Sequence, residues 1–503
     1  MPQTYHDQRP SSGNGTAVFL GILVSQFAAT LLVRSANVDL HKEMTAIIAK
    51  GYVAVPSPGV VKDLAGWFSA FMGGIFFTVT LGFLLILLSL SLVRLVQRTQ
   101  WSFSRRVAVL AAVWAILTIF VNSAGLNSGA TLYVSAVVVT VFITSVAGQR
   151  TLDRKERRLG RAFIVFAPLI LLAGLWMTRL DTDLFVDIRD RLLFSNPVGI
   201  KVVEFYYDYT LYGAQAMAPL SQHTMIGVDL SALKDDEDYR GLADALRQRD
   251  ALDIGEAPSA SAVLTPEGEG IRWQDATGRT LTVSRKDILE HPDVVVKQFS
   301  DTADRNGPFR LLTLAGIFIG FPVMLYLVLF AVIEGLLRYI AGRNAAIITA
   351  LVCLSTGAAL FYPLAAAPKI DFENTSAFDL WREGSPAARI MVLKQAVQKG
   401  IDPLRYQDAD ALSQSAGLAE RYWFARSLAG NRSDRGFELL GRMMNDPSPL
   451  VLCQVCYAFG EMNNPAVVPV LLRYIKNGGY WYAQRYAYAA LRKLGWLQEA
   501  RYR

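Results

Sequence analysis

Apolar residues gather in seven long blocks along the chain, and polar or charged loops separate these blocks. Such blocks are typical of transmembrane helices, because about 20 apolar residues in a helix cover the roughly 30 Å hydrocarbon core of a bilayer. Residues 1–15 before the first block are polar and predict a disordered cytoplasmic tail. The predicted spans are Thr16–Val33, Trp67–Val93, Val107–Val121, Ala130–Ala147, Ala162–Met177, Leu311–Leu337 and Ala345–Ala365.

The loops between these spans predict the orientation of the chain, because short inside loops carry the excess of Lys and Arg. The loops at 94–106, 149–161 and 338–343 fall on one side and hold twelve basic residues. The short loops on the other side hold Arg34 and three lysines. We therefore expect a multi-pass protein of a bacterial inner (plasma) membrane, with its amino terminus in the cytoplasm. Arg34 interrupts a small-residue cleavage site, so the first span is expected to stay as an anchor.

The predicted spans contain almost no ionisable residues, which are costly to bury in lipid and mark ion or proton pathways. Glu334 is the clear exception, and it lies four residues before Arg338 near an inner span end. This spacing predicts an ion pair at the membrane interface. Gln26 and Asn122 are expected to form hydrogen bonds between helices. The scarcity of charge argues against a transporter, a pump or a conducting channel.

Residues 180–308, between the fifth and sixth spans, predict a small α+β domain on the outer side. Asp181 to Phe194 has helical periodicity, and the aromatic run from Val202 to Tyr212 suits an amphipathic helix at the membrane interface. Gly278 lies in a turn between two alternating runs, a pattern that predicts a hairpin. The remaining expected elements are an extended run at Met225–Leu230, a helix at Asp235–Asp250 and the hairpin strands Ile271–Gln274 and Thr280–Val283.

Residues 368–503 show helix-length apolar patterns separated by Gly, Pro and Asn, and they contain an internal repeat. In Asp446–Leu472 one apolar helix ends before an Asn-Asn-Pro turn, and Pro465 begins a second one. The end of this first helix recurs about 32 residues later, at Ala490–Gly495. Helix pairs are expected to begin near Ser385, Ala416, Pro447 and Tyr480.

This repeat resembles short HEAT repeats of the bilin-lyase type over roughly residues 385–497. The resemblance implies a stacked α-solenoid that binds other proteins, because single units of this length do not bury their apolar faces alone. No family resemblance was found for the membrane part of the chain.

Aromatic and arginine residues cluster in the repeats and predict a surface that binds partner proteins. Tyr, Trp and Arg dominate binding hot spots because they bury a large area and still offer hydrogen bonds. About half of such residues in a solenoid helix face its core, so a purely structural role is the alternative. The predicted partner-binding residues are Arg421, Trp423, Arg426, Trp481, Tyr482, Arg485 and Tyr486.

Two cysteines, Cys453 and Cys456, lie three residues apart and therefore on one face of the predicted helix. Redox cysteines of this spacing gain their low pKa at the start of a helix, whereas these two lie inside one. A zinc site needs two further ligands, and the carboxy-terminal domain contains no histidine. We interpret the pair as buried core thiols, with a disulfide or a redox or metal site as the alternatives.

Acidic residues follow the fifth span and predict an alternative site at the membrane interface. Asp183, Asp187 and Asp190 lie along one helical face, and Tyr207 belongs to the aromatic run that follows. Paired carboxylates hold divalent cations or act as acid and base. A solvated helix with internal ion pairs is the simpler interpretation of the same pattern.

Composition and motifs exclude several classes of function. The net charge of +7 comes from short inner loops, so it does not indicate nucleic-acid binding. All four histidines lie outside the apolar blocks, where they cannot hold an intramembrane haem. The chain lacks GxxxxGK[ST], so no nucleotide is expected at a P-loop. No cofactor is expected.

These observations predict a polytopic α-helical membrane protein with about seven transmembrane helices, a small α+β extracytoplasmic insert and a C-terminal HEAT-like α-solenoid. The expected segments are a tail at 1–15, spans within 16–179 and 309–367, the insert at 180–308 and the solenoid at 368–503. We expect a scaffold or assembly subunit in an envelope complex, with the lipid bilayer and other envelope or secreted proteins as its partners. The alternative is a membrane enzyme or lipid-linked substrate handler with its site between the spans and the insert.

Overall fold

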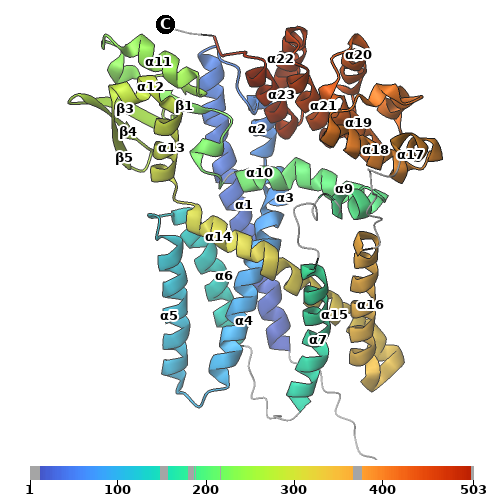
Figure 1. Cartoon of the computed structure of the whole chain (residues 1–503). Helices are drawn as coiled ribbons and strands as arrows, with labels where there is room; N and C mark the ends of the chain where they lie inside the picture. Colours follow the sequence, from blue (N-terminus) through green and yellow to red (C-terminus); the bar gives the residue numbers. More distant parts are fainter. Residues whose placement is uncertain are drawn as a thin grey trace, which may run out of the picture. The chain divides into compact units, whose positions relative to one another are not determined.

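The computed structural model describes residues 12–147, 157–178, 186, 188–215, 217–365 and 376–499. They belong to two compact units, each built from three separate segments of the chain (Figure 1). Unit 1 comprises Met1–Arg34, Ala70–Leu184 and Arg305–Ala365, and unit 2 comprises Ser35–Ser69, Phe185–Asp304 and Ala366–Arg503. Most of the predicted tail lies outside the described residues, and the first helix already begins at Ser12.

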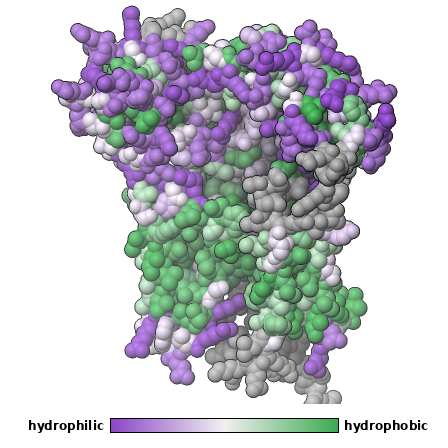
Figure 2. Space-filling model, viewed as in Figure 1, coloured by the Kyte–Doolittle hydropathy of each residue, from purple (hydrophilic) through white to green (hydrophobic). Residues whose placement is uncertain are grey.

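Helices connected by short turns make up the described residues of unit 1, and its surface is apolar. Ile119 and Ile170, for example, are 70% and 68% exposed. Figure 2 shows this apolar surface over α4, α5 and α7. Apolar side chains that face outward indicate contact with lipid rather than with water. Its helices are the first part of α1 (Ser12–Ala49), most of α3 (Trp67–Phe77), α4 (Phe83–Gln97), α5 (Phe103–Val121), α6 (Ser128–Ala147), α7 (Arg157–Met177), α14 (Gly307–Ala315), α15 (Phe321–Ala341) and α16 (Ala345–Ala365).

The described residues contain six apolar helical segments that are long enough to cross a membrane. The last segment, Gly307–Tyr362, has 56 residues and covers the sixth predicted span and most of the seventh. At about 1.5 Å per residue it is more than twice as long as a bilayer core is thick. Gly342 interrupts it with a φ of 50°, and α15 and α16 pack against each other on either side of this break. The coarse prediction of a helical membrane protein is therefore supported, and seven crossings stay a prediction.

Polar side chains inside unit 1 form the contacts that the sequence indicated. Gln26 Nε2 donates a hydrogen bond of 2.7 Å to the Phe71 carbonyl, which joins α1 to α3. Asn122 Nδ2 donates one of 2.6 Å to Thr131 Oγ1 of α6. The predicted Glu334–Arg338 ion pair is confirmed, at 3.0 Å. Arg161 Nη2 of α7 also lies 3.1 Å from the Glu334 carboxylate, a contact that the local spacing did not indicate.

The insert in unit 2 contains one mixed five-stranded sheet in the order β2-β1-β3-β4-β5. Strands β1 (Ile226–Asp229), β2 (Ala251–Asp253) and β3 (Ala262–Glu267) are parallel, whereas β4 (Gly270–Gln274) and β5 (Thr280–Ser284) extend the sheet as antiparallel strands. The predicted hairpin is confirmed, and Gly278 in its turn has a φ of 84°. Helices α11 (Tyr239–Arg247), α12 (Arg285–Glu290) and α13 (Pro292–Ala303) share an apolar core with the sheet around Trp273 and Phe299.

The end of α1 belongs to unit 2 and forms hydrogen bonds with this sheet and the residue before β3. Beyond its apolar part, the helix carries Glu43, whose buried carboxylate accepts hydrogen bonds from the Gly227 N–H at 2.8 Å and Ser261 Oγ at 2.5 Å. Met44 and Ile47 of the same helix are buried in the core that continues into the carboxy-terminal helices. The residues before the second predicted span thus form part of unit 2.

The carboxy-terminal helices of unit 2 form two rows. In one row α18 (Pro386–Lys399), α19 (Leu418–Ser427), α21 (Pro449–Met462) and α23 (Trp481–Lys493) pack successively against one another. In the other, α20 (Asp434–Met443) packs on α21, and α22 (Val468–Asn477) packs on α23. The first-row helices begin within two residues of the four predicted positions. The turn after α21 places Asn463 at a φ of 53°, which fits the predicted Asn-Asn-Pro break.

Candidate functional site

The predicted partner-binding residues lie on two helices of the first row, α19 and α23. Several of them contact a segment of the insert, residues 188–222, which belongs to the same unit. This segment includes the π-helical turn η2 (Arg189–Leu193), α9 (Pro197–Phe205), the π-helical turn η3 (Tyr206–Thr210) and α10 (Leu211–Gln215). We call it the clasp segment.

One end of the clasp segment is held by a buried carboxylate, that of Asp190. Its Oδ2 lies 2.7 Å from Lys394 Nζ of α18 and accepts a hydrogen bond of 2.9 Å from Trp423 Nε1 of α19. The neighbouring Arg189 pairs with the same carboxylate at 2.9 Å, and its guanidinium lies 4.3 Å from the centre of the Tyr422 ring. Because a buried charge is stable only when it is paired, this arrangement identifies Asp190 as a structural carboxylate.

The other end of the clasp segment packs on α23 through aromatic rings. Tyr207 meets Tyr482 edge-on with ring centres 5.5 Å apart, and Tyr212 meets Trp481 in the same way at 5.1 Å. Arg485 Nη1 donates a hydrogen bond of 3.3 Å to Gln215 Oε1. Edge-to-face pairs at these distances add to the free energy gained from burial. The clasp segment is thus the contact partner of four of the predicted residues, Trp423, Trp481, Tyr482 and Arg485.

Arg426 and Tyr486 each contact other residues of the repeats. The Arg426 guanidinium lies 3.9 Å from the centre of the Tyr457 ring and donates a hydrogen bond of 3.0 Å to Gln454 of the adjacent α21. The ring of Tyr486 lies 5.5 Å from that of Tyr482, and burial raises the pKa of its phenol to about 12. Arg426 therefore joins two neighbouring helices, α19 and α21, whereas Tyr486 packs on a ring of its own helix α23.

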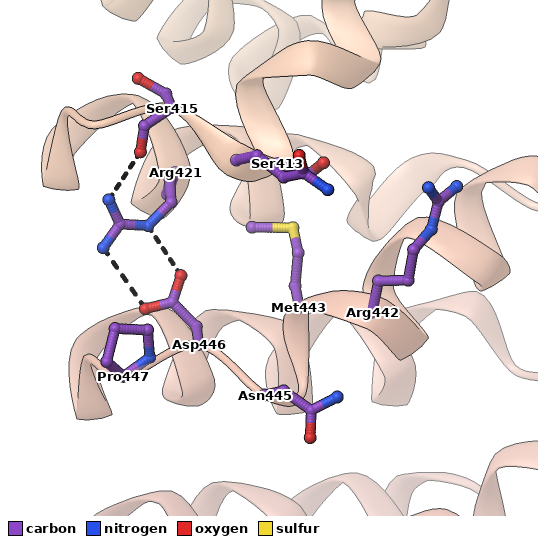
Figure 3. Close-up of a pocket in the computed structure, with 9 residues that line it drawn as sticks. Ser413, Ser415, Arg421, Arg442, Met443, Asn445, Asp446 and Pro447 are labelled. Atoms are coloured by element: carbon purple, nitrogen blue, oxygen red, sulfur yellow. Dashed lines mark hydrogen bonds and ion pairs between the residues drawn. The ribbon is translucent and has the colours of Figure 1, made fainter.

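Arg421 differs from the other six residues because it lines a pocket at the junction of two repeats (Figure 3). Its Nε donates to Asp446 Oδ2 at 2.7 Å, and its Nη1 donates to the Ser415 carbonyl at 2.7 Å. Such a fork fixes the guanidinium firmly. The pocket has a volume of about 330 Å³ and is lined by Ser413, Gln414, Ser415, Arg421, Arg442, Met443, Asn445, Asp446 and Pro447.

Arg442 is the other cation of this pocket, and the sequence did not single it out. Figure 3 shows Arg421 and Arg442 on opposite sides of Met443. Arg442 is exposed, and its side chain has no hydrogen bond or ion pair within the part of the chain that the structure describes. The pocket therefore combines one arginine held by a carboxylate with another whose donors face solvent. Such a site suits an acidic or carbonyl-rich segment of another protein.

Both cysteines of the predicted pair are free and buried in α21. Cys453 is 1% exposed and lies in an apolar cluster with Leu452 and Ala483, flanked by tyrosines. Burial raises the pKa of the Cys456 thiol to about 12, and burial raises that of Cys453 as well. A high pKa keeps both groups as neutral thiols at pH 7, which disfavours nucleophilic or metal-binding roles. Within the described residues, no group of three or more His, Cys, Asp or Glu side chains is arranged to hold a metal ion.

The alternative membrane-interface site is described only in part. Asp183 and Asp187 lie outside the described residues. Asp190 and Tyr207 are both engaged by the repeats, and burial raises the pKa of the Tyr207 phenol.

Other residues that hold the repeats in place were not predicted. Gln484 of α23 is completely buried, and its amide bonds the Ser57 backbone N–H at 2.9 Å and the Gly478 carbonyl at 2.7 Å. The available signal was a polar amide among the residues of α23 that face the core. Its partner Ser57, in the loop before α2 (Pro58–Leu64), lies 427 residues away in sequence.

Comparison with known families identifies one region of the chain. A family model described as HEAT repeats matches residues 407–492. This match confirms the resemblance expected for the C-terminal fifth, and such repeats commonly mediate protein–protein interaction. No curated protein and no solved structure matches the chain.

Proposed function

We propose that the chain is an integral membrane scaffold or assembly subunit whose HEAT repeats bind a partner protein on the outer side of a bacterial inner membrane. The match to HEAT repeats at residues 407–492 carries this proposal, and the long apolar helices support an anchor in the membrane. The excess of basic residues in the loops 94–106, 149–161 and 338–343 supports the outer location of both soluble parts. The partner is then an envelope or secreted protein.

The partner binds, in this proposal, at the pocket between the repeats that Arg421 and Arg442 line. The aromatic residues Trp423, Trp481 and Tyr482 already contact the clasp segment, so they hold the repeats to the insert. Asp446 holds Arg421 in place, whereas Arg442 presents free donors at the other side of the pocket. An exposed arginine beside a preformed pocket is a typical binding hot spot.

A photo-crosslinking side chain at position 442 of the full-length chain, expressed in its own cells, tests the proposal. We expect one dominant crosslinked envelope protein, which mass spectrometry identifies. The Arg442→Glu variant should reduce co-purification of that protein by about tenfold or more, because reversal of a hot-spot charge costs on the order of 2 kcal/mol. Arg473→Glu is the matched control, since Arg473 is an exposed arginine on the next second-row helix, α22.

Equal recovery of the partner with Arg442→Glu would place the binding surface elsewhere. The absence of any crosslinked or co-purified protein would contradict the scaffold role itself. The alternative of a membrane enzyme gains no support from Asp190, whose carboxylate is occupied by Lys394 and Trp423.

A further inference from the structure

Helix α9 and the turn η3 in the clasp segment have two faces of different character. On one face Gly199 and Val203 are buried, and Val203 belongs to the core that includes the repeat helices. Tyr207 continues this face into its contact with Tyr482 of α23. The clasp segment is thus fixed to the repeats along one side. This contact also fixes which of its side chains point away from the repeats.

A second face, about 100° around the helix from the buried one, is apolar and exposed. Val198, Val202 and Tyr206 follow one another at intervals of four residues, and they are 73%, 53% and 44% exposed. Residues four apart lie on the same side of a helix, so these three form one continuous apolar strip. Lys201, which is also exposed, lies beside it. An apolar strip with a flanking lysine is typical of a helix that rests on a lipid surface.

The clasp segment contacts the start of a predicted span, and this contact indicates how deep its apolar face lies in the membrane. Phe68, which is 64% exposed, lies in the first turn of α3, where the apolar segment Trp67–Gln97 begins. Its ring lies 6.3 Å from that of Tyr209, and Tyr209 lies 5.4 Å from Phe205 of α9. A residue in the first turn of a transmembrane helix lies at the membrane–water interface, so the aromatic rings in contact with it lie there as well.

We propose that the face formed by Val198, Val202, Phe205, Tyr206, Tyr209 and Phe68 lies in the headgroup region of the bilayer that the chain spans. Lipid is its occupant: the valines meet the acyl boundary, the tyrosines occupy their preferred interfacial level and Lys201 reaches the phosphates. The clasp segment then holds the repeats on one side and the membrane surface on the other. This inference rests on the membrane anchor of the proposed function, but not on the identity of any partner.

A nitroxide label at Val202→Cys tests the inference in the full-length chain in phospholipid nanodiscs. Cys353→Ala removes the one native thiol of the described residues that is not buried. We expect the label to collide with dissolved oxygen about threefold or more above its collision with a water-soluble nickel chelate, because oxygen concentrates in lipid. The matched control is Val294→Cys on α13, where Val294 is 47% exposed and the nickel chelate should dominate.

Nickel accessibility at Val202 equal to that at Val294 would overturn the inference, because the face would then lie in water. Low accessibility to both reagents would also overturn it, because protein would then cover the face. A label at Val198→Cys provides a second position on the same strip, so that one poorly folded variant does not decide the result. If the Val202 label lies in water while the partner still crosslinks at position 442, this inference fails and the proposed function stands.

Discussion

The carboxylate of Asp190 joins three parts of unit 2 at a single point. It pairs with Arg189 in its own turn, with Lys394 of α18 and with the indole N–H of Trp423 of α19. Each of these donors is itself largely buried. Loss of one of them therefore leaves buried charge or buried hydrogen-bonding groups without a full set of partners. At the residue scale, the charges of the insert and the aromatic side chains of the repeats therefore form one structural network.

His223 lies in the same unit, just before β1, and gives its stability a dependence on pH. Burial lowers the pKa of its imidazole from 6.5 to about 4, and the charge of Arg485 lowers it further, against a backbone hydrogen bond with Ala218. Between these two values the unfolded chain binds a proton that the folded chain does not, so stability falls as pH falls. From pH 7.5 to 5.5 we expect a loss of stability on the order of 1 kcal/mol from this residue.

Thermal melting of the full-length chain in detergent at the two pH values measures this effect. The His223→Gln variant keeps a polar side chain but cannot be protonated, so the decrease in Tm between pH 7.5 and 5.5 should be smaller than in the unaltered chain. An identical decrease in both proteins would show that the pKa of His223 is the same in the folded and the unfolded chain, which would contradict the lowered pKa.

The sequence predicts which side chains are suited to binding but not what they bind. The sequence singled out Trp423 and Arg485 for partner binding, and in the structure each of them contacts the chain's own clasp segment. The contact between Trp423 and Asp190 spans 233 residues, and no local spacing encodes such a pair. Arg442 was missed for the opposite reason, because its pocket arises only when α20 packs beside the loop that contains Ser413.

At the scale of elements, two π-helical turns pack against each other inside unit 1. These are η1 (Thr78–Gly82), between α3 and α4, and η6 (Gly316–Gly320), between α14 and α15. A Cβ atom at Gly320 would lie 2.7 Å from the Leu84 backbone nitrogen and 2.8 Å from the Thr80 carbonyl oxygen. Glycine is therefore required at Gly320, because it lets the two backbones approach closely.

The Gly320→Leu variant should separate these helices. Overpacking of a close interface costs about 1–3 kcal/mol, so we expect a clearly lower Tm for the full-length chain in detergent. Gly335→Leu is the matched control. Gly335 lies in α15, the helix that follows η6, and nothing lies within 4 Å of its Cβ position. Equal Tm values for the two variants would contradict close packing at η1 and η6.

Elements with strong periodicity or marked turns were predictable, and short buried strands were not. The first-row helices begin close to the predicted positions because Pro, Gly or Ser marks each start. Strand β2 has only three residues, and β3 contains Pro266, which normally argues against a strand. Pro266 is tolerated because β3 pairs there with β4 alone, while β1 reaches only Ala262 and Val263.

At the scale of the whole molecule, the segment Gly307–Tyr362 decides on which side the carboxy terminus lies. If α15 and α16 each cross the membrane, the chain crosses seven times and the repeats lie on the side opposite the amino terminus. If the segment crosses once, the repeats lie with the arginine-rich loops. The break at Gly342, the packing of α15 on α16 and the basic residues Arg338 and Arg343 all favour two crossings.

A reporter enzyme that is active only outside the cytoplasm, fused after residue 503, distinguishes the two topologies. With seven crossings and an inner amino terminus, this fusion should be active, and a matched fusion within the loop at 149–161 should be inactive. The result also bears on the binding surface, because an outward carboxy terminus restricts partners of the Arg442 pocket to envelope or secreted proteins. Activity of the 149–161 fusion together with an inactive fusion at 503 would reverse the orientation. Such a result would direct the search for a partner to the cytoplasm.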